Sequence, residues 1–97
     1  MTEDRAFQDV LAERRRQIGV EGWTPEHDDA HDDGVMAAAA ACYAIVDNEQ
    51  AMECVEFFDN LWPWSRNWWK PTDRRRNLVK AAALIIAEIE RIDRNAP

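Results

Sequence analysis

The chain has 97 residues, of which 46% are hydrophobic and 32% are charged. This length fits one helical domain over residues 1–97, and the composition is too apolar for a disordered chain and too charged for a membrane protein. Strongly apolar runs such as residues 81–87 are far shorter than the roughly 20 residues that span a bilayer. Because the first residues lack a secretory signal, we expect a soluble cytoplasmic protein that makes no contact with a membrane.

The net charge of −7 is distributed unevenly along the chain. Residues 17–65 contain no lysine or arginine and hold eleven of the nineteen acidic residues, so the two ends are net positive. Proteins that bind duplex DNA normally present a basic surface overall, so we do not expect this chain to bind duplex DNA. Two arginine triplets, at residues 14–16 and 74–76, remain candidates for holding a small anion.

Two helices are expected in the first half of the chain. Apolar side chains recur at helical spacing over residues 3–19, which predicts a first helix that stops at Gly19. Thr24 can cap the next helix and a proline follows it, as is usual for a first helical position. A second helix is therefore predicted from about residue 25 to residue 46, with a break at Gly34 as the alternative.

The second half predicts a short helix, an aromatic loop and a long helix. Apolar spacing favours a short helix over residues 50–61. Residues 61–72 hold four of the five tryptophans and two prolines, which disfavour continuous helix, so we expect an ordered loop there. Thr72 can cap a last helix that reaches Asn95, and its roughly 22 residues would measure about 33 Å.

The last helix is apolar around nearly its whole circumference. Three short helices can hardly bury such a helix on all sides, so we expect a homo-oligomer that forms across it. On this hypothesis, glutamate in place of Leu84 or Ile86 should break the assembly. The fold class expected is therefore all-α: a bundle of about four helices with a loop rich in tryptophan and proline, oligomerising through the C-terminal helix.

Four segments of the chain together resemble a group of small, uncharacterised proteins of bacteriophages and prophages. These segments are ERRRQIGVEGWTPEHDDAHDDG, the alanine-rich stretch ending in CYA, WPWSRNWWKP and DRRRNLVKAAALIIAEIERIDR. The resemblance spans nearly the full chain and implies a compact helical product with an accessory role in infection, such as nucleotide metabolism or counter-defence. The group has no established activity, so the resemblance implies no catalytic residues.

A cluster of acidic and histidine residues follows Thr24 and is a candidate metal site. His27 and His31 lie one helical turn apart and can grip one metal ion, with Glu26 and Asp28 beside them. Acidic residues in a first helical turn also favour the helix dipole without any metal, and the spacing fixes no third ligand. An ordinary solvated helix start is therefore the simpler interpretation.

Carboxylates also recur one helical turn apart, as they do in helical nucleoside-triphosphate pyrophosphohydrolases of the MazG type, where such pairs hold magnesium. At this spacing stand Glu26 with Asp29 and Glu53 with Glu56 and Asp59, and a further pair, Glu88 and Glu90, is two residues apart. The first pair reads ExxD where that family has ExxE, and acids at such intervals are common on solvated helix faces. A magnesium-dependent enzyme is therefore kept as an alternative.

The aromatic loop and the basic ends predict a binding site for a nucleotide-like ligand. Indole faces stack on bases, and guanidinium groups form paired hydrogen bonds to phosphate. We expect at least two of the four loop tryptophans to be core residues instead. For the basic side chains, salt bridges to acidic residues explain the sequence as well as a ligand site does. The candidate ligand-binding residues are Arg14, Trp23, Trp64, Trp68, Trp69, Lys70, Arg75 and Lys80.

The leading functional hypothesis is a phage or prophage accessory protein that binds a nucleotide or similar small anion, with sequestration of a nucleotide immune signal as one such role. The first alternative is the pyrophosphohydrolase, which would need magnesium or another divalent metal. The second is an interaction module that docks on a host protein through the tryptophan loop. No other cofactor is indicated.

Overall fold

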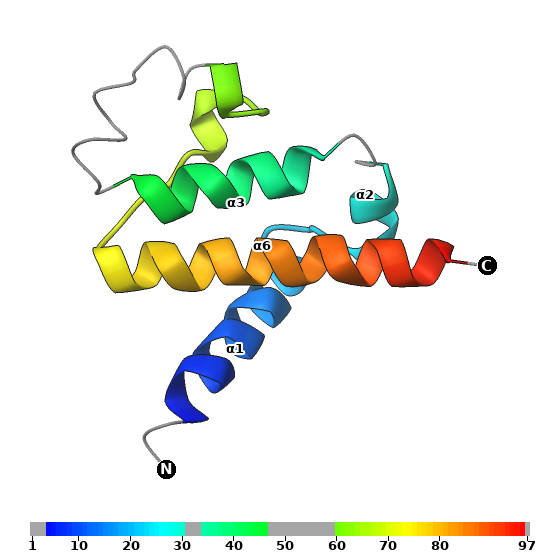
Figure 1. Cartoon of the computed structure of the whole chain (residues 1–97), viewed down its shortest axis with the longest axis horizontal. Coiled ribbons are helices and arrows are strands. Elements are labelled where there is room, and N and C mark those ends of the chain that lie inside the picture. The colour runs from blue at the N-terminus through cyan, green and yellow to red at the C-terminus, as the bar shows by residue number, and fades with distance from the viewer. Residues whose placement is uncertain (1–3, 31–33, 47–59, 97) are drawn as a thin grey trace.

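The computed structural model describes residues 4–30, 34–46 and 60–96, which form four α-helices and one 3₁₀ turn and contain no strand. In chain order these are α1 (Arg5–Gly19), α2 (Pro25–Asp29), α3 (Val35–Ile45), the 3₁₀ turn η2 (Arg66–Trp68) and α6 (Arg74–Asn95) (Figure 1). The all-α prediction is confirmed. The short helix predicted over residues 50–61 lies, apart from its last two residues, outside the described part of the chain.

The segment predicted as a second helix is divided at Gly34. Thr24 caps α2 as predicted, since its Oγ1 accepts a hydrogen bond from the backbone N–H of His27 at 3.3 Å. Gly34 precedes α3 with a φ of 84°, a left-handed conformation that glycine adopts without steric cost. The helical run therefore forms two helices, α2 and α3, instead of one.

The last helix begins one residue later than its predicted cap implies. The side chain of Asp73 accepts a hydrogen bond from the backbone N–H of Arg76 at 2.9 Å, so Asp73 is the cap. Thr72 instead donates its backbone N–H to Asn77 Oδ1 at 2.7 Å. Threonine and aspartate both cap helices well. At the other end, α6 stops at Asn95, as predicted.

α6 is the element on which the other described helices pack. α3 lies alongside it and runs in the opposite direction, α1 crosses it obliquely, and α2 lies near its second half (Figure 1). Small side chains let α3 and α6 approach closely, among them Ala39 and Ala40 on α3 and Ala81 on α6. Tyr43, Trp62 and Leu84 complete this core.

α6 buries one side and exposes another. Leu84 is 1% exposed and belongs to the core of the protomer, so the prediction that it forms an oligomer contact is wrong. Leu78, Ile85, Ile89 and Ile92 are between 42% and 53% exposed and form an apolar stripe on the outer side.

Across the ranges that the structure describes, no helix combines the length and the apolar character that crossing a membrane requires.

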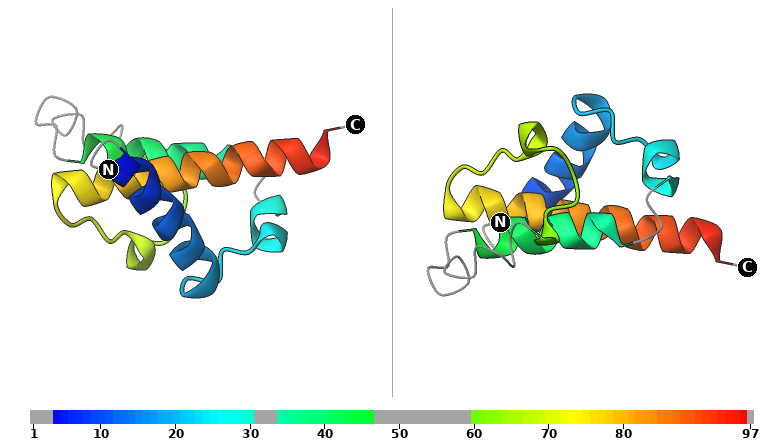
Figure 2. Two further views of the ribbon diagram at one scale, coloured as in Figure 1. Left: turned by 90° about the horizontal axis from the view of Figure 1, so that it is seen from below. Right: turned by 90° about the horizontal axis from the view of Figure 1, so that it is seen from above.

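The elements that form the candidate site lie on one side of the α3–α6 pair. In both views of Figure 2 the end of α1, its connection to α2 and residues 60–73 lie on that side. Two sequence regions rich in aromatic residues are thereby brought together.

Candidate ligand pocket

Three tryptophans from two distant parts of the sequence line one pocket. Trp23 lies between α1 and α2, whereas Trp64 and Trp68 lie in the segment before α6. Together with Glu21, His27 and Ser65 they line an open pocket of about 340 Å³. The Trp23 ring lies 5.5 Å from that of Trp64 and 6.4 Å from that of Trp68, measured between centroids. This volume is at the lower end of the about 300–1,000 Å³ typical of small-molecule sites.

The backbone fixes Trp23 at this position. Its N–H donates to the carbonyl of Gln17 at 2.9 Å, and its own carbonyl accepts from Arg14 Nη1 at 3.3 Å. On its other side the Trp23 ring stacks on the His27 ring, with 6.3 Å between centroids and 12° between planes. The indole is therefore held by α1 and α2 before any ligand arrives.

Tyr43 of α3 holds the backbone of the tryptophan loop. Its hydroxyl donates to the carbonyl of Trp68 at 3.4 Å and accepts from the N–H of Lys70 at 3.2 Å. Burial raises the pKa of Tyr43, so the hydroxyl stays protonated and able to donate. The position of Trp68 thus depends on a side chain from the helical core.

Two of the loop tryptophans serve the core. Trp62 is buried, and its Nε1 donates to the carbonyl of Ser65 at 3.2 Å. Trp69 packs against Trp62 and Tyr43, with ring centroids 4.8 and 4.7 Å away. This division agrees with the expectation that at least two tryptophans are core, and it leaves Trp64 and Trp68 at the pocket.

Lys80 anchors the same loop from α6. Its Nζ donates to the carbonyl of Lys70 at 2.6 Å and lies 5.6 Å from the centroid of the Tyr43 ring. Burial, followed by the charge of Arg76, lowers the pKa of Lys80. Lys80 therefore holds the backbone of the tryptophan loop from α6 and does not line the 340 Å³ pocket.

A smaller cavity of about 20 Å³ adjoins the pocket and shares Glu21, Trp23 and Trp68 with it. Gln17, which is 1% exposed, lines this cavity, and its Oε1 accepts no hydrogen bond from the residues that the structure describes. The volume is on the scale of one water molecule. The inner end of the site therefore offers a buried hydrogen-bond acceptor.

Glu21 links the two spaces and is neutralised by two cations. Its Oε1 accepts from Arg16 Nη1 at 3.0 Å, and its Oε2 lies 3.5 Å from Lys70 Nζ. The Lys70 ammonium also lies 5.6 Å from the Trp68 ring centroid and is more than half exposed. Lys70 is thus a cation at the mouth of the pocket that can move toward a ligand.

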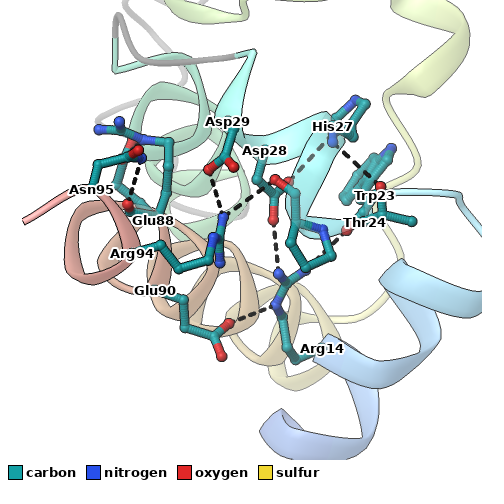
Figure 3. A network of polar contacts seen from close by, with 12 residues as sticks. Arg14, Trp23, Thr24, His27, Asp28, Asp29, Glu88, Glu90, Arg94 and Asn95 are labelled. Carbon is teal, nitrogen blue, oxygen red and sulfur yellow. Dashed lines mark hydrogen bonds and ion pairs between the residues drawn. The ribbon is translucent and has the colours of Figure 1, made fainter.

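Arg14 joins α1, α2 and α6 behind the pocket (Figure 3). Its Nη2 donates to Asp28 Oδ2 at 2.7 Å, and its Nε donates to Glu90 Oε1 at 3.0 Å. The side chain is only 4% exposed. Its donors serve the two carboxylates and the Trp23 carbonyl, and Arg14 does not line the pocket.

The remaining arginines near the crossing of α1 and α6 also pair with acids. Arg75 is half exposed, lies 2.8 Å from Asp9 and does not line the tryptophan pocket. Glu13 is buried and pairs with Arg16 and Arg76. Burial acts to raise the pKa of Glu13, but the hydrogen bonds and charges of the two arginines outweigh it and leave that pKa below its ordinary value.

The acidic and histidine cluster forms no three-ligand site within the described residues. Asp28 is buried and paired with Arg14, and its Oδ1 lies 3.3 Å from His27 Nδ1. Glu26 is exposed, and His31 lies outside the described residues. The metal site therefore stays a prediction.

Sequence reasoning missed Glu21 and Ser65 as pocket residues and assigned His27 to a metal. Glu21 stands two residues before Trp23, and Ser65 follows Trp64, so closeness to a candidate tryptophan was the available signal. Of the predicted ligand-binding residues, Trp23, Trp64 and Trp68 line the pocket, and Lys70 and Lys80 line the small cavity that adjoins it. No protein-family model matches the chain, and no curated protein and no solved structure matches it either.

Proposed function

We propose that the chain is a phage or prophage accessory protein that binds a nucleotide or a similar small anionic ligand in the tryptophan pocket. The observation that carries this proposal is the convergence of Trp23, Trp64 and Trp68 on one open pocket of about 340 Å³. Aromatic platforms of this kind hold bases by stacking, at about 1–3 kcal/mol per base. The likeness of the sequence motifs to small phage proteins supports the setting.

The base would stack on Trp68, which is the most accessible of the three indoles. Trp68 is 43% exposed, whereas Trp23 and Trp64 are half-buried and form the inner walls. Glu21 and Ser65 at the same pocket can accept hydrogen bonds from the edge of a base. These groups give the pocket both an apolar face and polar contacts that can select a ligand.

Lys70 would contact the phosphate. Its Nζ already lies near the Trp68 ring and is held by Glu21 only at 3.5 Å, so a phosphate can compete for it. Arg14, Arg75 and Lys80 are not part of this proposal for phosphate binding, because the first two pair with carboxylates and the third donates to a backbone carbonyl.

Binding without turnover is the form of the proposal that we put first. Magnesium-assisted hydrolysis remains the alternative, and His31, Glu53, Glu56 and Asp59, which it could use, lie outside the described residues. Sequestration of a nucleotide signal needs affinity alone. A docking module for a host protein is the function that would remain if no small ligand binds.

We also propose that the chain forms a homo-oligomer through α6. Leu78, Ile85, Ile89 and Ile92 expose a continuous apolar stripe, and exposed patches of this kind mark interaction sites in soluble proteins. Sedimentation velocity over a range of concentrations tests this directly, and a monomer at every concentration would overturn it.

Calorimetric titration with linear and cyclic nucleotides tests ligand binding. We expect heat from at least one nucleotide, a loss of about 1–3 kcal/mol in affinity for Trp68→Ala, and no loss for Phe7→Ala, which removes an exposed aromatic on another face. Flat titrations with the whole panel would overturn the proposal. Binding that survives Trp68→Ala unchanged would show that the ligand lies elsewhere.

A further inference from the structure

The exposed apolar side chains of α6 follow a coiled-coil repeat. They stand at positions 78, 82, 85, 89 and 92, so the intervals between them are four, three, four and three residues. This alternation keeps one seam of a helix facing a partner helix. Ala82 is half-buried, and the four larger side chains are exposed to between 42% and 53%. The described helices of the same protomer leave this seam open.

An apolar groove runs beside the seam. Phe7, Val10 and Leu11 of α1 face Ala82, Ile85 and Ile86 across a groove of about 350 Å³. Phe7 is 77% exposed, so the α1 wall of the groove also lacks a cover within the described residues. The small side chain of Ala82 leaves room at this point for a larger one from outside.

We infer that a second copy of this chain covers the seam, with the two α6 helices antiparallel and crossing near residue 87. The inference rests on the proposed self-association and adds its geometry. Positions 82 and 92 are equally far from residue 87, and so are positions 85 and 89. An antiparallel copy therefore places Ala82 opposite Ile92 of the partner subunit and Ile85 opposite Ile89 of the partner subunit.

Side-chain size favours the antiparallel arrangement. Here the one small residue of the seam opposes a large one, and the partner subunit's Ile92 fills the groove beside Ala82. A parallel pair in register would set Ala82 against its own copy and leave a void between two methyl groups. Well-packed helix interfaces alternate small and large side chains across facing positions.

Charge favours the same arrangement. Residues 74–80 carry Arg74, Arg75, Arg76 and Lys80 and no acid. A parallel pair would bring two such segments together, and like charges in contact are unfavourable. An antiparallel pair that crosses near residue 87 places the two basic segments at opposite ends of the interface.

Disulfide trapping tests the direction of pairing. In an antiparallel dimer position 85 meets position 89, while two copies of position 85 lie four residues apart along the axis, about 6 Å in addition to the separation across the seam. We expect a mixture of Ile85→Cys and Ile89→Cys chains to crosslink, and neither variant to crosslink efficiently with itself. The unmodified chain under the same oxidant gives the background from Cys42 and Cys54.

The possible results are distinguishable. Dimers in which each variant crosslinks with itself and the mixture does not would show parallel pairing, which overturns this inference and leaves self-association standing. A monomer at all concentrations would overturn both. As a second measurement, Ile89→Glu should raise the dimer dissociation constant roughly a hundredfold or more, because the symmetry places the charge in the seam twice. Val20→Glu, an equally polar change at an exposed residue outside the seam, should leave it unchanged.

Discussion

Arg14 and Asp28 form a buried ion pair, with 2.7 Å between Nη2 and Oδ2, and both side chains are at most 4% exposed. The pair fixes the end of α1 to α2 immediately behind Trp23. Removing Asp28 leaves the buried Arg14 guanidinium with only the half-exposed Glu90 as a charged partner, and the loss of a hydrogen bond between charged groups costs about 1.5–3 kcal/mol. We therefore expect Asp28→Ala to lower the free energy of unfolding by about that amount, measured by urea denaturation.

The double variant Arg14→Met, Asp28→Leu is the matched control for this pair. Because it removes both charges and keeps apolar volume, it should recover much of the lost stability. If the single and the double variant lost the same free energy of unfolding, the loss would not come from the charge that the single variant leaves buried.

The two roles of the loop tryptophans should separate in experiment. Trp62→Ala removes a buried ring and should lower the free energy of unfolding by about 3–5 kcal/mol. Trp68→Ala removes an accessible ring and should change it by less than about 1 kcal/mol, while weakening ligand binding. Thermal melts combined with nucleotide titration check both, and a large stability loss for Trp68→Ala would assign that ring to the core.

Tyr43→Phe removes one hydroxyl that both donates to Trp68 and accepts from Lys70. The loss of two hydrogen bonds should cost about 1–3 kcal/mol of stability, at about 0.5–1.5 kcal/mol each. Because both partners belong to the loop, the affinity for a nucleotide should fall as well. Hydrogen exchange at the Lys70 amide is the direct measurement, and unchanged protection would show that the hydroxyl does not hold the loop.

Stability should fall in acid because of Glu13. Its folded pKa lies below the ordinary value of 4.5, so the ionised form is stabilised by folding. This contribution is complete above pH 4.5 and is lost as the pH falls through the lower folded pKa. Urea midpoints between pH 7 and pH 3 should show the decline.

Glu13→Gln supplies the comparison for the acid prediction. It should be less stable at pH 7, because two arginine partners lose their carboxylate, and its stability should depend less on pH in the acid range. A slope unchanged in Glu13→Gln would mean that other carboxylates dominate.

Local signals predicted the helices well, and tertiary contacts determined the rest. The cap at Thr24 and the end at Asn95 depend on neighbouring residues, so the sequence contains them. A glycine inside a helical pattern is tolerated at a cost, so the sequence left two alternatives at Gly34, one continuous helix or a break. The positive φ of Gly34 in the structure decides for the break. Thr72 and Asp73 are both residue types that cap helices, and the residue that caps α6 is Asp73, the type with the stronger preference for that position.

The candidate site was predictable in residue type and not in arrangement. Tryptophans were expected at a ligand, yet which of them remain accessible depends on Tyr43, a residue of α3 that no spacing rule connects to the loop. Arg14 was expected either at a ligand or in a salt bridge, but its partners Asp28 and Glu90 come from two other helices. Ion pairs between distant segments leave no pattern in a single sequence.

The packing of α1, α2 and α3 on α6 also has a consequence for biosynthesis. Their principal contacts within the described residues are with α6, which follows all three in the chain. Helices that emerge earlier from the ribosome have no surface on which to bury their apolar sides until α6 is made. Domains generally fold as units during synthesis, at about 5–20 residues per second. In this chain the core should close only after α6 has left the exit tunnel.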